Sequence, residues 1–187
     1  MGIGFISFWV VNLGLLIDNL YPTTPPVLGV ICFLSIIIIT VYSLINGRLI
    51  NLKSIKILSS KVDDQIRLIF ISDTHLGSNS KKHLEKILLK IKDLKFDLLL
   101  IGGDFIDSSS FNLDELDILK NLKKPIFFIS GNHEYYIKDY DNKLKNLKNY
   151  NISFLDNESF KFKKLNLIGI GDNLTLENQK NIASRLI

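Results

Sequence analysis

Charge is almost absent from the first quarter of the chain. Within residues 1–47 the one charged side chain is Asp18, whereas the other 18 of the 19 acidic residues and all 23 lysines and arginines follow Gly47. Folded soluble domains place charged side chains at their surface throughout their length. We therefore expect a membrane segment, residues 1–47, joined to a charged globular segment.

Cysteine is also scarce, and other common signatures are missing. The single Cys32 lies within an apolar run, which excludes a disulfide framework and indicates a small packing residue. The lysines are dispersed and the net charge is only +4, so nucleic acid is not a favoured partner. No Gly-x-Gly-x-x-Gly follows the first apolar strand, which argues against a dinucleotide-binding domain.

Two apolar runs fill the membrane segment. Residues 27–45 carry no charge over about 19 residues, which matches the roughly 20 residues that cross a bilayer as a helix. Residues 3–17 are interrupted by Asn12 and Gly14 and form either a first span or a re-entrant arm. The prolines between the runs break any helix there, which predicts a helical hairpin. A signal peptide is the competing interpretation, but the sequence has neither a basic N-terminal region nor a small-x-small cleavage site.

The charges that flank the second apolar run predict its orientation. The loop before this run carries only Asp18, whereas the residues after it are basic. Because the cytoplasmic flanks of membrane spans are enriched in lysine and arginine, we expect the globular part in the cytoplasm. The basic residues are Arg48, Lys53, Lys56 and Lys61.

The globular segment follows a basic linker at residues 48–65, in which residues 55–62 are predicted as an edge strand. Three apolar strands are expected at residues 67–72, 96–101 and 126–129, and their unbroken apolar runs predict burial on both faces. Helical apolar spacing follows each of the first two strands. A strand–helix–strand repeat of about 30 residues implies parallel neighbours, so the fold class is α/β.

The later elements are predicted by the same patterns. Leucines mark the second helix, and a lysine-rich helix is expected near residues 139–149. Further strands are expected at residues 152–155, 160–163 and 165–170, followed by a helix that begins at Glu177. The leucines of the second helix are Leu113, Leu116, Leu119 and Leu122.

Polar clusters follow each of the first three strands. A single cluster is more often a turn or a helix cap than a metal site, but three in succession at the ends of parallel strands indicate a metal site. Carboxylate, amide and imidazole ligands suit Mn, Fe or Zn. Two such ions about 3.5–4 Å apart would clamp a phosphate and activate a water. The clustered residues are Asp73, His75, Asp104, Asp107, Asn132 and His133, whereas His83 has no such context.

This combination resembles the calcineurin-like metallophosphoesterase family, and most of all its membrane-anchored bacterial members. Residues 71–77 (ISDTHLG), 103–107 (GDFID) and 131–134 (GNHE) match the first three family motifs. Residues 167–172 look like the strand that crosses into the second sheet. The resemblance implies the N-terminal half of a metallophosphoesterase-type α/β/β/α sandwich over residues 66–187, preceded by one or two transmembrane helices.

The resemblance also implies a role for each clustered residue. Asp73 and His75 would bind the first metal, Asp104 would bridge both metals and Asn132 would bind the second. His133 would donate to the phosphoryl oxygen or the leaving group, and Asp107 would orient it. The metals of the family are divalent ions, here Mn, Fe or Zn.

The later histidine motifs of the family are missing, since no histidine follows His133. The first metal keeps Asp73, His75 and Asp104, and the second keeps Asp104 and Asn132, so at most partial metal binding is expected. The sequence ends within a helical pattern, and we expect a truncated product or fragment. A second polypeptide would then supply the missing half of the domain.

Two functions follow from this pattern. The first is metal-dependent hydrolysis of a phosphomonoester, a phosphodiester or a lipid-linked pyrophosphate at a binuclear centre, incomplete in this chain. The second is a non-catalytic membrane protein, or a degenerate fragment of such an enzyme. Membrane anchoring favours a lipid-like phosphorylated substrate, and Tyr135 and Tyr136 are the aromatic residues nearest to the motifs.

Overall fold

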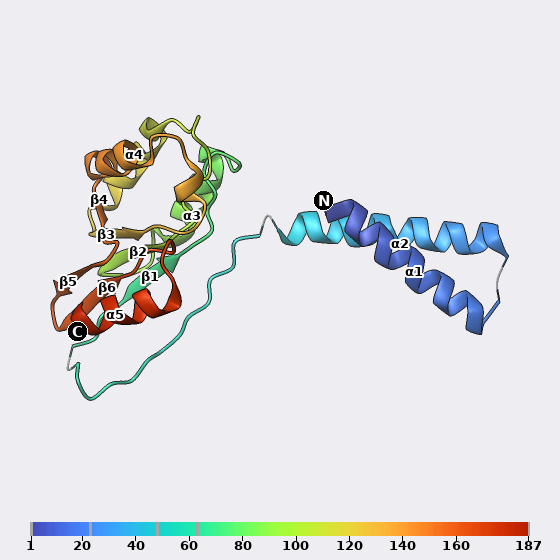
Figure 1. Ribbon diagram of the computed structural model, residues 1–187, viewed down its shortest axis with the longest axis horizontal. Helices are drawn as coiled ribbons and strands as arrows, with labels where there is room; N and C mark the ends of the chain where they lie inside the picture. The colour runs from blue at the N-terminus through green and yellow to red at the C-terminus, as the bar shows by residue number, and fades with distance from the viewer. Residues whose placement is uncertain (1, 23, 48, 63, 187) are drawn as a thin grey trace. The chain divides into compact units, whose positions relative to one another are not determined.

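Two compact units make up the chain, residues Met1–Lys53 and Ser54–Ile187. The computed structural model describes residues 2–22, 24–47, 49–62 and 64–186. The first unit holds two long helices, and the second holds two β-sheets with shorter helices (Figure 1).

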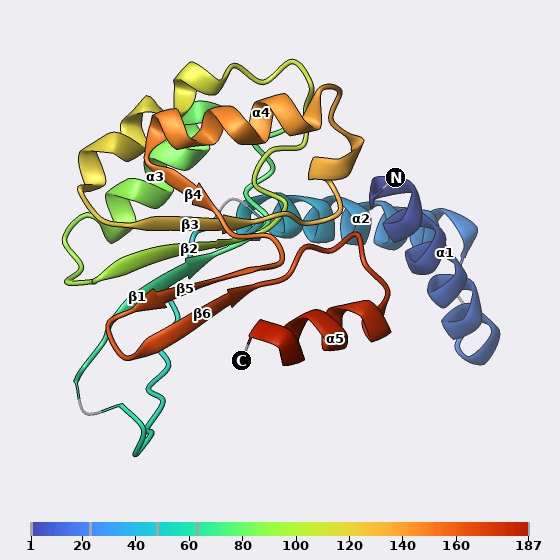
Figure 2. The same ribbon diagram turned by 60° about the vertical axis from the view of Figure 1, so that its left-hand side comes forward.

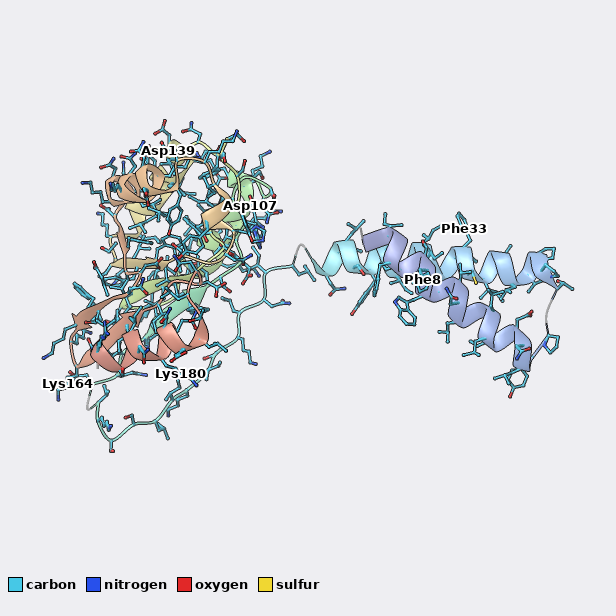
Figure 3. All side chains as sticks on the ribbon, in the orientation of Figure 1. Phe8, Phe33, Asp107, Asp139, Lys164 and Lys180 are labelled. Carbon is cyan, nitrogen blue, oxygen red and sulfur yellow. The ribbon has the colours of Figure 1, made fainter. Side chains whose placement is uncertain are left out.

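The first unit is the helical hairpin that the two apolar runs predict. It consists of α1 (Gly2–Leu20) and α2 (Pro25–Asn46), each longer than its apolar run. Both helices are long and apolar enough to cross a membrane. Most of their large side chains are exposed, among them Phe8 and Phe33, which are labelled in Figure 3. Such an all-round apolar surface is typical of helices that face lipid.

The two helices approach each other closely at Gly14 and Cys32. A Cβ atom on Gly14 would lie 2.7 Å from the Cys32 Sγ atom, so only glycine fits the present contact. The thiol of Cys32 also lies 3.9 Å from the Val10 carbonyl oxygen. Small residues at helix crossings let backbones approach in apolar surroundings. Cys32 is therefore the packing residue that the sequence indicates.

A four-stranded parallel sheet is the centre of the second unit. All three pairs of neighbouring strands are parallel, as expected for strands joined by helical crossovers. The predicted α/β class is confirmed. The strands lie in the order β1 (Leu68–Ile71), β2 (Leu98–Gly102), β3 (Ile126–Ile129) and β4 (Ile152–Phe154).

Helices cover one face of this sheet (Figure 2). Their apolar side chains pack against strand residues such as Ile101 and Phe128 and form the main core of the unit. Burial of this apolar surface is the principal force that holds helices and sheet together. The helices are α3 (Lys81–Ile91), α4 (Tyr140–Asn146) and two 3₁₀-helices, η1 (Leu113–Leu122) and η3 (Leu147–Tyr150).

The second predicted helix, η1, is a 3₁₀-helix and not an α-helix. Its leucines recur at every third position, and a 3₁₀-helix has three residues per turn, so all of them lie on one face. Leu116 and Leu119 in the middle of this face are fully buried. The Asn112 side chain caps the start by accepting a hydrogen bond from the Asp114 N–H at 3.0 Å.

An antiparallel hairpin covers the opposite face of the sheet. Its strands are β5 (Glu158–Phe162) and β6 (Leu165–Gly169), and α5 (Leu176–Leu186) lies beside β6 in Figures 1 and 2. Between the sheets, the buried Leu98 and Phe127 pack with hairpin residues in a second, smaller core. Helices, parallel sheet, hairpin and α5 therefore follow one another in the layer order of an α/β/β/α sandwich.

Two local predictions are wrong. Residues 55–62 form no strand, and Ile57 within them is 85% exposed. Burial on both faces holds for β2 and β3 but not for β1, in which Leu68 and Phe70 are exposed. The hairpin packs under β2 and β3, and β1 at the sheet edge lacks that cover.

Two leucines of α3 provide a matched test of the main core. Leu84 is fully buried, whereas Leu89 on the same helix is 60% exposed. We predict that Leu84→Ala lowers the free energy of unfolding by about 2–5 kcal/mol, because it leaves a cavity. Leu89→Ala should change it by less than about 0.5 kcal/mol. Urea unfolding of the full chain in detergent, followed by near-ultraviolet circular dichroism, measures both, and equal effects would contradict this packing.

Candidate metal centre

The loops that follow β1 and β2 lie side by side at the carboxyl edge of the parallel sheet. Backbone hydrogen bonds continue the strand pairing beyond the strands: the Asp73 N–H donates to the Gly103 carbonyl at 3.2 Å and the His75 N–H to the Asp104 carbonyl at 2.9 Å. Leu76 then pairs with Phe105 in the same way at 2.8 Å. The first two polar clusters are therefore fixed against each other by backbone contacts.

Three of the polar residues have a strained backbone. The φ angles of Asp73, His75 and Asp104 are 55°, 49° and 50°, in the left-handed region that residues with a side chain rarely adopt. Such conformations cost of order 1–3 kcal/mol each and concentrate at functional sites. Here they occur in the segments that follow β1 and β2, where the predicted ligands lie.

His75, Asp104 and His133 lie together at this edge. Their ligand atoms all lie within 4.8 Å of one another, and all three residues are half-buried. The rings of His75 and His133 meet edge to face, with centroids 4.6 Å apart and planes at 79°. The structure thus brings one residue from each of the three predicted clusters to a single point.

These three side chains suit a divalent metal ion. Ligand atoms bound to one ion at about 2.0–2.2 Å lie roughly 3–4 Å apart, so small side-chain movements bring this group into range. Two imidazoles and a carboxylate match the preferences of Zn, Fe and Mn. The backbone N–H of His133 holds the Asp104 carboxylate by donating to its Oδ1 atom at 3.0 Å.

Asp73 and Asn132 lie on a cavity that adjoins this group. The cavity has a volume of about 300 Å³, and its lining includes Asp104. Two lining residues, Asp172 and Gln179, were not predicted from the sequence. Three carboxylates and no lysine or arginine stand among the described residues that line it, so the cavity favours cations.

Asp107 lies against His75. Its Oδ2 atom is 3.4 Å from the His75 Nδ1 atom, and its Oδ1 atom accepts a hydrogen bond from the Ser78 N–H at 2.9 Å. A carboxylate behind a histidine fixes the tautomer and leaves the other ring nitrogen free for a metal. The family resemblance assigns Asp107 to His133. Asp107, labelled in Figure 3, lies after β2. The pairing with His133 remains a prediction.

Glu134 holds the loops together, a role that sequence reasoning missed. It begins the short 3₁₀-helix η2 (Glu134–Tyr136), and its side chain is fully buried. Its two oxygens accept four backbone hydrogen bonds, from residues after β2 and β3. The donors are the N–H groups of Asp104 at 3.0 Å, Phe105 at 2.6 Å, Ile106 at 2.9 Å and Gly131 at 2.9 Å.

Burial and hydrogen bonding act in opposite directions on this carboxylate. Burial raises the pKa of Glu134, and the four N–H donors partly offset that rise because they stabilise the charged form. With four donors around it, the carboxylate has every strong acceptor position in use. Glu134 is therefore a fixed anchor beneath Asp104 and not a free acid or base.

Two glycines permit the close approach of these loops. A Cβ atom on Gly103, whose φ angle is 92°, would lie 2.7 Å from the Gly131 nitrogen. A Cβ atom on Gly131 would in turn collide with the Asp104 carboxylate. Glycine at both positions therefore lets the second and third clusters touch.

A second polar group lies behind β3. Asp156 accepts a hydrogen bond from the Ser130 N–H at 2.8 Å and another from the Tyr135 hydroxyl at 3.2 Å. The Ser130 and Tyr140 hydroxyls are 2.9 Å apart. Burial raises the pKa of Asp156 and of Tyr135. Tyr135 thus supports the loop from below, whereas its neighbour Tyr136 is 79% exposed beside His133.

The sequence matches a known protein family over most of the globular unit. A family model described as calcineurin-like phosphoesterase covers residues 66–184. A metallophosphoesterase of Helicobacter pylori is 31% identical over 133 residues, which are 69% of this chain and 36% of that protein.

Two further relatives carry more specific names. A Bos taurus transmembrane protein with metallophosphoesterase domain is 27% identical over 51% of this chain and 22% of its own length. The 3',5'-cyclic adenosine monophosphate phosphodiesterase CpdA of Haemophilus influenzae is 32% identical over 39% of this chain and 31% of its own length. The chain thus spans about a third or less of the length of these relatives. An activity of a relative can therefore only be proposed for this chain.

The anchoring role of Glu134 gives a prediction on stability. Glu134→Gln places an amide NH₂ group against two of the four N–H donors, and each unsatisfied buried donor costs about 1–3 kcal/mol. We expect the free energy of unfolding to fall by about 2–5 kcal/mol in urea titrations of the full chain in detergent. The control, Glu158→Gln, changes an exposed carboxylate of β5 and should have little effect. A neutral Glu134→Gln would contradict this role.

Proposed function

The chain belongs to the calcineurin-like phosphoesterase family, and from this membership we propose that it hydrolyses a phosphoester at a divalent-metal centre. One observation carries the proposal: His75, Asp104 and His133 come from three different strand ends and meet within 4.8 Å. Three residues so far apart in the sequence converge in this way at one carboxyl edge of a parallel sheet, where α/β folds place their ligands.

In this proposal, Asp73, His75 and Asp104 bind a first metal ion, and Asp104 and Asn132 bind a second. A bound ion would neutralise phosphate charge and lower the pKa of a water. The backbone N–H of His133 holds the Asp104 carboxylate in place, and the backbone N–H of Asp104 donates to Glu134. Asp73, Asp104 and Asn132 all line the adjoining cavity, which supports these three oxygen donors as ligands of a metal pair.

His133 is proposed as the residue that donates a proton to the leaving oxygen. Its half-buried ring stands beside His75, and its neighbour in sequence, Asn132, lines the cavity. Asp107 is proposed to orient the imidazole pair. Its contact with His75 at 3.4 Å supports an orienting role in this part of the site.

The relatives and the membrane segment support a proposal for the substrate class. One relative is named as a cyclic nucleotide phosphodiesterase and another as a transmembrane protein. We propose a phosphodiester first, with a phosphomonoester or a lipid-linked pyrophosphate as the other candidates. The basic residues after α2, among them Lys53 and Lys56, support a cytoplasmic location of the globular unit.

A second candidate function is metal binding without turnover. The group that meets within 4.8 Å supplies three ligand residues, His75, Asp104 and His133, and a second polypeptide is proposed as the source of further ligands. Hydrolysis by the purified chain separates the two functions.

Metal content and hydrolysis test the proposed centre together. The full chain in detergent should bind Mn, Zn or Fe(II) and, if it is active alone, hydrolyse bis-p-nitrophenyl phosphate. Asp104→Asn should lower metal affinity and activity by at least about 10–100-fold. Asp141→Asn, an exposed carboxylate of α4, is the control and should leave both unchanged. A chain that binds no metal would contradict the centre, and metal binding without hydrolysis would favour the second function.

His133→Ala distinguishes a proton donor from a metal ligand. Loss of a general acid lowers the rate by about 10²–10⁴-fold while the metal content is retained. The proposal therefore predicts unchanged metal content, measured by elemental analysis, with lost hydrolysis. If the metal is lost instead, His133 is a ligand, as its distance to His75 and Asp104 also permits.

A further inference from the structure

Residues 49–62, here called the juxtamembrane strip, expose large aliphatic side chains without covering any core. The exposed fractions of Leu49 and Leu52 are both 56%, and those of Ile55, Ile57 and Leu58 are 71%, 85% and 82%. A contiguous apolar stretch of this kind marks an interaction surface. The strip belongs to neither the metal centre nor the core of the globular unit.

The charge of the strip has one sign. Lys53, Lys56 and Lys61 lie among the aliphatic residues, and no acidic residue occurs before Asp63. Lysine next to exposed leucine and isoleucine is the composition of segments that lie on anionic membrane surfaces. An acidic protein surface could bind the lysines but would also need an apolar region for the aliphatic side chains. An anionic bilayer interface accommodates the lysines and the aliphatic side chains together.

The backbone of the strip suits an interface and not the bilayer interior. No helix or strand occurs in the described residues 49–62. The Leu49 N–H donates to the Asn46 carbonyl at 3.1 Å and the Lys61 N–H to the Ser59 hydroxyl at 3.2 Å, but no regular pairing satisfies the other backbone N–H and C=O groups without water or headgroups. Such a backbone is not tolerated in hydrocarbon, where polar groups have no partners. The headgroup region supplies these partners and still accepts aliphatic side chains.

The bilayer is also the surface within reach. The strip follows directly on α2, which ends at Asn46 and is apolar enough to cross a membrane. At about 3.3–3.6 Å per residue, Ile57 lies at most roughly 40 Å from the end of that helix. We propose that residues 49–62 bind the anionic lipid surface of the membrane that α2 crosses. Aliphatic side chains enter the headgroup boundary and the lysines contact anionic headgroups.

Depth-dependent quenching tests this proposal on the full chain. The background is Cys32→Ala, which removes the one native thiol. Ile57→Cys is labelled with the environment-sensitive fluorophore NBD in nanodiscs of phosphatidylcholine, with and without phosphatidylglycerol. The matched control is Lys161→Cys, an exposed position on β5. We expect a blue shift at position 57, and loss of emission with doxyl-labelled lipid, both larger with phosphatidylglycerol and absent at position 161.

Each other outcome overturns part or all of the proposal. An unshifted, unquenched label at position 57 in both lipids would exclude membrane binding. A blue shift without quenching by lipid would indicate a protein partner or a second copy of the chain. Equal quenching in both lipids would exclude the charge contribution. Lys53→Glu with Lys56→Glu should abolish the difference between the two lipids, and Lys161→Glu should not.

Discussion

The candidate site depends on the buried carboxylate of Glu134. Its two oxygens accept four backbone N–H groups, three after β2 and one after β3, so two loops that are distant in sequence share one anchor. The same interaction holds the Asp104 backbone, and Asp104 in turn accepts the His133 N–H. A left-handed conformation at Asp104 persists because these contacts fix both sides of it. The backbone strain at Asp104 is thus balanced by the hydrogen bonds that hold it.

The layers around the sheet explain why this anchor lies at one edge. Parallel strands direct β1, β2 and β3 toward the same side, and helices on one face and a hairpin on the other exclude water from their middle. Only the carboxyl ends of the strands remain open to ligands, as in other open α/β sheets. Asp156, at the end of β4, extends the same row of polar groups and holds Ser130 from behind.

The sequence predicted elements whose signal is local and missed those that depend on distant partners. Apolar runs located β2 and β3, and the clusters after them located Asp104 and His133. Asp156 also follows a strand, but it was overlooked because no histidine lies next to it in the sequence. Glu134 was missed because its four donors lie elsewhere in the chain. The leucine spacing of η1 fits three residues per turn better than 3.6. Residues 55–62 contain several aliphatic side chains but form no strand.

The charge of the cavity lining determines which ligands the candidate metal centre favours. Asp73, Asp104 and Asp172 line the cavity, and the described lining has no lysine or arginine. A phosphate brought there alone would meet like charges in a partly desolvated site, where repulsion is stronger than in water. Cations reverse this sign, because each divalent ion offsets two carboxylates. On the proposed function, divalent ions would therefore have to occupy the site before this cavity could attract a phosphate.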